Sequence, residues 1–251
     1  MIEALHFLRP AETLLLMLPR RAEVNDLTRV TFLDLVLRRE LRVEWHFEQT
    51  TETIHRSIGT GPKFRPHHAL LHEEFLLRPL MDRPDSTMPL PEYTKRVRAE
   101  LPPGDAYGRE YVHNPRLEPW FAHRLFFNRF LGGYGPNAKG NALGTEIWNF
   151  LGDLDRSLFN HGKPGKRMVR KLLALRGNIF LLDGLTPFVC DVMDTYRRNW
   201  EHSGNAAYTE YEDYRPFYAA PNLPKNPASY RALKQALHGG YDFQKVEATA
   251  D

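Results

Sequence analysis

The chain has 251 residues, of which 42 % are hydrophobic, 12 % aromatic and 26 % charged. This balance supplies enough apolar side chains for a core and excludes a protein that is disordered throughout. The net charge is only +3, so the field of the whole molecule does not by itself imply a polyanionic partner. A single cysteine, Cys190, excludes an intramolecular disulfide and a cysteine metal cluster.

The N-terminal residues do not resemble a targeting segment. Residues 1–6 lack the basic region and apolar run that are typical of a secretory signal. The apolar run at residues 14–18 is too short to cross a bilayer. We therefore expect a cytoplasmic protein that could contact a membrane only peripherally.

Residues 1–62 predict a winged-helix-like unit. A short helix over 11–18 is stopped by Pro19, and a second helix follows with Asp26 as its N-cap and leucines at helical spacing. From Leu41 the apolar period changes to two, which indicates a half-buried strand. Residues 54–58 can return as its partner, so the predicted order is helix, helix, hairpin.

Residues 63–200 predict a helical domain. The predicted helices cover 69–81, 120–131 and 145–159; the predicted loops are a proline-rich stretch over 84–103 and a glycine-containing stretch over 132–144. Residues 164–183 then read as a helix followed by a strand over 179–182. Because 167–182 aligns without gaps on 29–44, this segment predicts a second copy of the first unit. A chance similarity between two helix–turn–strand segments is the alternative.

Residues 201–251 are rich in tyrosine and proline, which favours an extended C-terminal arm with one short helix near 229–237. Such an arm could stack on bases or dock on a protein partner, or it could cover its own domain. The whole chain therefore predicts a mainly α fold with short β-hairpins, containing winged-helix-like units in two related copies. The sequence does not predict an oligomeric state.

The stretch from Arg156 to Leu182 contains seven Lys or Arg residues and no acid. At about 100° per residue its cations gather on one side of a helix, with the apolar residues opposite. Such a face can hold phosphates of nucleic acid or of acidic lipid, although a solvated face paired with distant acids is the simpler interpretation. The predicted anion-binding residues are Lys163, Lys166, Arg167, Arg170 and Lys171.

A histidine cluster is the candidate metal site. His68 and His72 stand four residues apart, a spacing that would place both on one helical face, and His67 precedes them. A third ligand would have to come from elsewhere, and surface histidines at a helix start are the simpler interpretation. The glycine-rich loop lacks the ending of a phosphate-binding loop, and Cys190 reads as a buried thiol. We therefore assign no catalytic residue, metal ligand or cofactor.

Four leucine-rich segments resemble the Golgi phosphoprotein family, whose helical members bind phosphorylated lipid headgroups at membrane surfaces. They are residues 11–18, 32–44, 70–77 and 167–183. The resemblance implies a headgroup site that uses a tryptophan and an arginine just ahead of the second segment. This chain has no tryptophan there, and Thr28 occupies the arginine's position beside Arg29. The basic residues of the family's later helix have counterparts in Lys166, Arg167, Arg170 and Lys171.

These observations favour a non-enzymatic binding or adaptor protein that holds an anionic surface, either acidic lipid headgroups or other phosphates, through the basic helix. A winged-helix regulator that binds nucleic acid is the first alternative. A metal-dependent enzyme around His68 and His72 is the second.

Overall fold

The computed structural model describes residues 3–102, 106–121, 135–161, 163–202, 212–220 and 223–243. The protein is mainly helical with one small antiparallel sheet, which confirms the expected class. The α-helices are α1 (Pro10–Met17), α2 (Val24–Leu37), α3 (Leu71–Met81), α4 (Leu90–Glu100), α5 (Ala138–His161), α6 (Lys166–Ala174), α7 (Pro187–His202) and α8 (Pro227–His238). The strands are β1 (Leu41–Glu48), β2 (Thr53–Thr60) and β3 (Thr87–Pro89). Shorter helical turns are η1 (Glu3–His6), η2 (Pro66–His68), η3 (Tyr107–Val112), η4 (Glu118–Trp120), η6 (Arg176–Leu181) and η7 (Arg215–Phe217).

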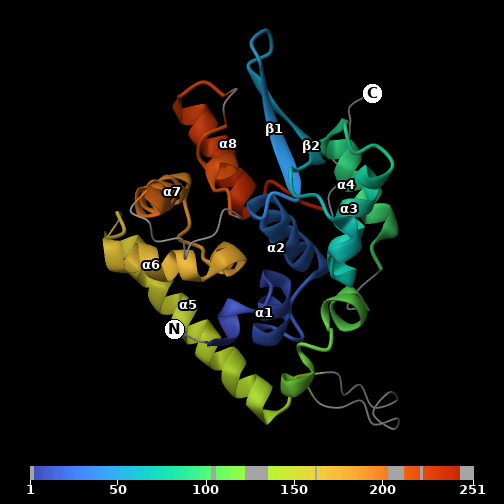
Figure 1. The fold of residues 1–251 in the computed structure, drawn as a ribbon, viewed down its shortest axis with the longest axis vertical. Coiled ribbons are helices and arrows are strands. Elements are labelled where there is room, and N and C mark those ends of the chain that lie inside the picture. The colour runs from blue at the N-terminus through green and yellow to red at the C-terminus, as the bar shows by residue number, and fades with distance from the viewer. Residues whose placement is uncertain are drawn as a thin grey trace.

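Helix α2 lies at the centre of the molecule (Figure 1), and α1, α3, β1 and η6 pack against it. Ten of its 14 residues are buried, which is typical of a helix enclosed by its neighbours. The hydroxyls of its buried Thr28 and Thr31 donate to the carbonyls of Val24 and Leu27, so both polar groups are satisfied within the helix. The helix begins at Val24, and the predicted N-cap at Asp26 is wrong. Asp26 instead lies in the first turn, where its charge suits the positive end of the helix.

The predicted hairpin is present. Strands β1 and β2 pair antiparallel from Leu41 opposite Thr60 to Glu48 opposite Thr53. A third strand, β3, pairs with β2 and is followed at once by α4, both within the stretch that we predicted to be a proline-rich loop. That prediction is wrong because Pro91 stands in the first turn of α4, where proline fits a helix without losing a hydrogen bond.

The second predicted helix–strand unit is only half correct. Helix α6 is present, but residues 179–182 do not form a strand, because most of them belong to the 3₁₀ helix η6. The chain turns at Arg176, which has a φ of 51°, and the Asn178 side chain then donates to the carbonyls of Leu5 and Leu8. These contacts bind η6 to the N-terminal segment, and no strand in the described ranges pairs with it.

The described part of the C-terminal segment is packed against the body of the protein, so the predicted extended arm is wrong for residues 212–220 and 223–243. The rings of Tyr241 and Phe243 lie 4.5 Å and 5.9 Å from that of Phe32 in α2, and Phe217 stacks edge-on against Phe180 at 5.1 Å. The predicted helix in this segment is α8. Aromatic rings bury large apolar areas, which explains why a proline-rich segment is held on the core. One apolar cluster includes residues from 1–62, 63–200 and 201–251.

Two other predictions concern the middle of the chain. The glycine-containing loop ends earlier than expected, because α5 begins at Ala138 and continues to His161. This helix includes the predicted one at 145–159. Most of the helix predicted over 120–131 lies outside the described residues.

Candidate functional site

Helix α6 has the amphipathic character that its sequence predicts. Val169, Leu172 and Leu173 are buried, and Leu175 just beyond the helix is buried as well. They anchor the helix against η6 and α7. The opposite side is left in solvent.

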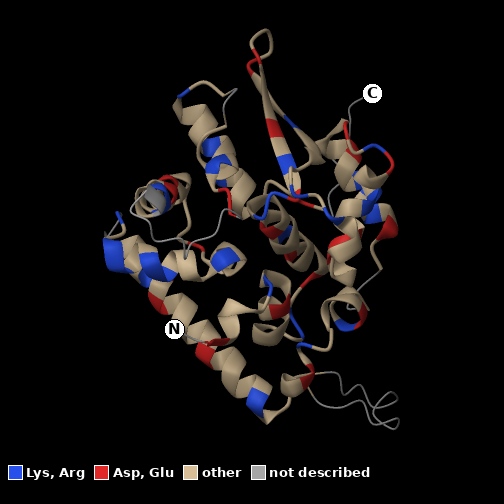
Figure 2. Ribbon diagram, in the orientation of Figure 1, with Lys and Arg blue, Asp and Glu red and all other residues tan. Residues whose placement is uncertain are grey.

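The five predicted anion-binding residues form one exposed surface, which we call the basic face: Lys163, Lys166, Arg167, Arg170 and Lys171. Figure 2 shows the concentration of Lys and Arg along α6, beginning at its outer end. Lys163 lies three residues ahead of the helix, not on it. Within the described part of the chain, none of the five side chains forms a salt bridge with an acid. The interpretation that these cations are paired with distant acids therefore has no support from the described residues.

The start of α6 adds to this positive charge. Its N-cap is Gly165, no side chain caps the first turn, and no acid stands there. The unbonded N–H groups of a helix start carry a partial positive charge, and Lys166 and Arg167 add two full charges beside it. Like charges gathered in this way repel each other, so a bound anion would stabilise this end of the helix.

Arg170 is the member of the basic face whose position is fixed by described contacts. Its Nε donates to the Tyr196 hydroxyl at 2.8 Å, and its guanidinium lies 4.7 Å from the centre of the Trp200 ring. Both aromatic residues belong to α7 and pack edge to face on each other. Arg170 therefore links α6 to α7 as well as contributing charge.

The histidine cluster does not have the geometry that its spacing suggested. His67 and His68 are exposed in the turn η2, whereas His72 is fully buried in α3, so the i, i+4 pair does not share a helical face. Burial lowers the pKa of His72 to about 3, which keeps the ring neutral. The neighbouring Glu73 is bound to Arg38 at 2.6 Å. Within the described ranges, no group of three His, Cys, Asp or Glu residues could hold a metal ion.

Cys190, the remaining reactive candidate, is fully buried in α7, and burial raises the pKa of its thiol. The buried-thiol interpretation is confirmed.

Thr28 and Arg29 stand where the family resemblance implies the arginine of a headgroup site, and both make contacts within the protein. Thr28 is buried in α2, and Arg29 donates to the carbonyl of Leu237 at 2.9 Å. Burial lowers the pKa of Arg29. Arg29 thus binds α8 to the centre of the protein and does not offer a free cation to a headgroup.

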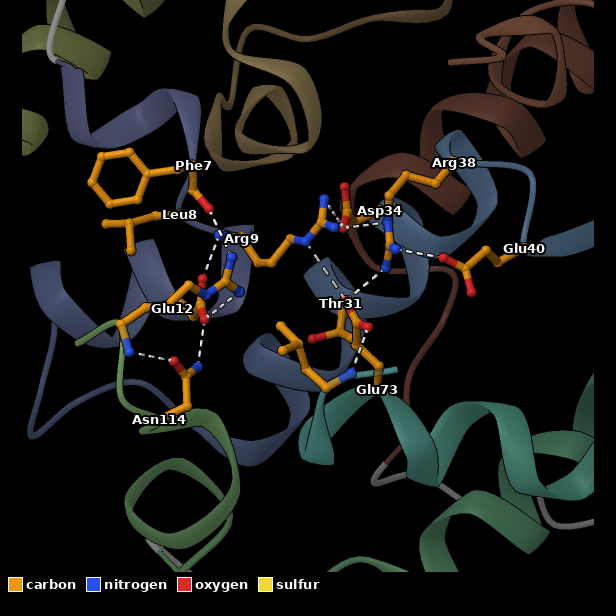
Figure 3. A network of polar contacts seen from close by, with 12 residues as sticks. Phe7, Leu8, Arg9, Glu12, Thr31, Asp34, Arg38, Glu40, Glu73 and Asn114 are labelled. Atoms are coloured by element: carbon orange, nitrogen blue, oxygen red, sulfur yellow. Dashed lines mark hydrogen bonds and ion pairs between the residues drawn. The ribbon is translucent and has the colours of Figure 1, made fainter. Parts of the chain in front are cut away.

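No local pattern in the sequence indicated the polar cluster around Arg38 and Glu12, which we call the polar junction (Figure 3). Arg38 forms ion pairs with Asp34 at 3.0 Å, with Glu40 at 2.5 Å and with Glu73 at 2.6 Å. Its acids come from α2, from the residue before β1 and from α3, so they are distant in sequence and share no motif. Only the i, i+4 spacing of Asp34 and Arg38 was visible as a signal.

A second half of the polar junction surrounds Glu12, which is fully buried in α1. Its carboxylate accepts from the backbone N–H of Arg9 at 2.6 Å, from Arg116 at 2.7 Å and from the amide of Asn114. Burial raises the pKa of Glu12, while these donors lower it. The guanidinium of Arg9 lies 3.9 Å from the carboxylate of Glu73 and 4.0 Å from that of Asp34, so Arg9 links the two halves of the junction. The four acids and three arginines of the junction pair with one another and tie α1, α2 and α3 together.

No helix in the described ranges is both long and apolar enough to cross a membrane. No protein-family model matches the chain, and neither a curated protein nor a solved structure matches it significantly.

Proposed function

We propose that this protein is a non-enzymatic adaptor that holds an acidic lipid surface through the basic face. The observation that carries the proposal is the presence of five exposed cations within nine residues, at an uncapped helix start, with no acid paired to them among the described residues. Lipid phosphates are the anions that such a surface suits. The proposal places the protein in the cytoplasm, peripheral at a membrane.

The nucleic-acid alternative has less support. The order α1, α2, β1, β2 fits a winged-helix-like unit, in which the second helix would enter the major groove. Here the second helix is α2, which is enclosed on all sides and has ten buried residues from Leu27 to Leu37. Among the described helices, α6 carries the basic face and is therefore the candidate to meet a duplex, but its nine residues span only about 13 Å at a rise of 1.5 Å each. We extend no proposal to a protein partner at residues 212–243, because the aromatic side chains described there are mostly buried.

Electrostatic attraction alone gives this surface a modest affinity. A cation close to an acidic membrane contributes about 1 kcal/mol. Five such charges give roughly 5 kcal/mol, which corresponds to a dissociation constant between the micromolar and millimolar ranges. A second, apolar contribution would be needed for stable attachment.

A parallel binding assay tests the proposal. The full chain is mixed with phosphatidylcholine vesicles, with mixed phosphatidylcholine–phosphatidylserine vesicles, with duplex DNA and with RNA, each at a low and a high salt concentration. The proposal predicts binding to the mixed vesicles alone, and weaker binding at high salt because the surface charges are screened. Binding to DNA or RNA without binding to acidic vesicles would replace the proposal with the nucleic-acid alternative. Binding to none of them would overturn both.

The charge-reversal variant K166E/R167E locates the site. Both residues are exposed and make no described contact, so the substitution should leave the fold intact. Arg170 is a poorer choice because its contacts with Tyr196 and Trp200 would be lost as well. The variant R231E/K234E on α8 removes the same number of charges from exposed positions and serves as the matched control.

A further inference from the structure

Helix α5 carries two large aromatic side chains that the core does not cover. Trp148 is 54 % exposed and Phe159 is 68 % exposed, the latter being the most exposed large apolar residue among those described. They stand eleven residues apart, which is three helical turns plus about 20°. The two rings therefore lie on the same side of α5, separated by about 16 Å along its axis. We call this pair the aromatic row.

The aromatic row is distinct from the face of α5 that packs on the protein. Ile147, Leu151, Leu154 and Leu158 supply the inner face and are buried. Between the two aromatic residues, on the outer side, lies Gly152. A methyl group placed there would meet no described atom within 4 Å, so nothing described covers the row at its middle.

Charge along the aromatic row is low. Asp155 is the acid nearest to it, and its carboxylate accepts from the backbone N–H groups of Asp183 at 3.1 Å and of Gly184 at 2.8 Å. Its oxygens are thereby directed at the turn after η6. Burial raises the pKa of Asp155. The row thus presents apolar surface flanked by Asp155, which is bonded within the protein, and by the exposed Arg156, which pairs with Asp153.

The aromatic row ends beside the basic face. Phe159 precedes Lys163 by four residues, so their backbones are at most about 14 Å apart. In Figure 1 the same end of α5 approaches the outer end of α6. An exposed aromatic row that adjoins a cluster of cations has the composition of a surface that lies in the headgroup region of a membrane.

We infer that α5 lies along the bilayer interface and inserts Trp148 and Phe159 among the lipids while the basic face binds the acidic headgroups. This inference rests on the proposed function and supplies the apolar contribution that electrostatic attraction leaves missing. A duplex offers phosphates but no apolar exterior, so it would bind the cations and leave the aromatic row in water. The partner of both features together is therefore an anionic membrane.

The test uses the full chain and mixed phosphatidylcholine–phosphatidylserine vesicles, with the variants Phe159→Ser and Trp148→Ser. Each is expected to weaken binding about tenfold, because a partly exposed aromatic side chain would no longer leave water, and to leave the salt dependence unchanged. Tyr230→Ser on α8 is the matched control, since Tyr230 is 44 % exposed and lies outside the aromatic row. Wild-type affinity in both aromatic variants would overturn the inference.

A second measurement does not depend on affinity. Brominated lipid quenches tryptophan that enters the bilayer, and Trp148→Phe keeps an apolar side chain while removing the fluorophore. The inference predicts that the quenched part of the emission is present in the wild type and absent in Trp148→Phe. Equal quenching in both proteins would show that Trp148 stays outside the lipid and would overturn the inference.

The outcomes separate the two claims. If K166E/R167E abolishes vesicle binding while both serine variants bind normally, the basic face holds the membrane and the insertion of α5 is refuted. If the serine variants lose binding while K166E/R167E keeps it, insertion stands and the electrostatic proposal fails. Unchanged circular dichroism and thermal midpoints in every variant confirm that the differences arise at the surface.

Discussion

Replacing Arg38 by methionine tests whether the polar junction holds the centre of the fold together. The side chain of Arg38 is only 17 % exposed, and those of its partners Asp34 and Glu73 are 4 % and 2 % exposed. Methionine keeps most of the volume and removes the charge. The carboxylates of Asp34 and Glu73 would then remain almost completely buried. Among the described ion pairs, only those with the guanidinium of Arg9, at about 4 Å, would still reach them.

The expected loss is large because buried charges are costly once their partner is removed. Removing one member of a buried ion pair typically costs about 3–5 kcal/mol. The partial exposure of Arg38 and the presence of Arg9 place the expected value near the lower end, at roughly 3 kcal/mol. The control Arg42→Met breaks the exposed pair between Arg42 and Glu44, whose side chains are 53 % and 31 % exposed. Its expected cost is at most about 1 kcal/mol.

Urea denaturation followed by circular dichroism measures both variants. An Arg38→Met variant as stable as Arg42→Met would refute the structural role of the junction.

Two further stability predictions follow from single positions. Burial raises the pKa of Glu212 to about 7 from an ordinary 4.5, so the stability that its protonated form contributes is complete below pH 4.5 and is lost as pH rises through 7. In thermal denaturation at pH 8, Glu212→Gln should therefore be more stable than wild type by up to about 3 kcal/mol. The same pH profile of stability in both proteins would contradict this. A methyl group on Gly177 would lie 2.0 Å from Oδ1 of Asp34, so Gly177→Ala should lose about 1–3 kcal/mol in urea. The control Gly152→Ala, in open space on α5, should gain about 0.5–1 kcal/mol, and equal stabilities for the two would contradict the packing at Gly177.

The sequence predicted the elements whose signals are local. The alternation from Leu41 onward specified β1, and the separation of cations from leucines specified the exposed and buried sides of α6. Both patterns depend on the period of one element and need no knowledge of its neighbours.

Contacts between distant segments were beyond such reasoning. The strand predicted at 179–182 failed because the side chain of Asn178 donates to the carbonyls of Leu5 and Leu8, which are 173 and 170 residues away in the chain. The extended arm failed because Tyr241 and Phe243 pack on Phe32. In the same way, the histidine spacing could not reveal that α3 begins only at Leu71, which separates His68 from His72.

The salt dependence of vesicle binding by a matched pair of variants tests the central claim most directly. K166E/R167E and R231E/K234E both change the net charge from +3 to −1, since each replaces two cations by two acids. At about 1 kcal/mol per charge near the membrane, K166E/R167E loses up to roughly 4 kcal/mol at low salt. We predict at least a tenfold loss of binding to mixed phosphatidylcholine–phosphatidylserine vesicles for K166E/R167E, with a flatter salt dependence, and nearly wild-type behaviour for R231E/K234E. Equal losses in the two variants would show that only net charge matters and would contradict a site on the basic face.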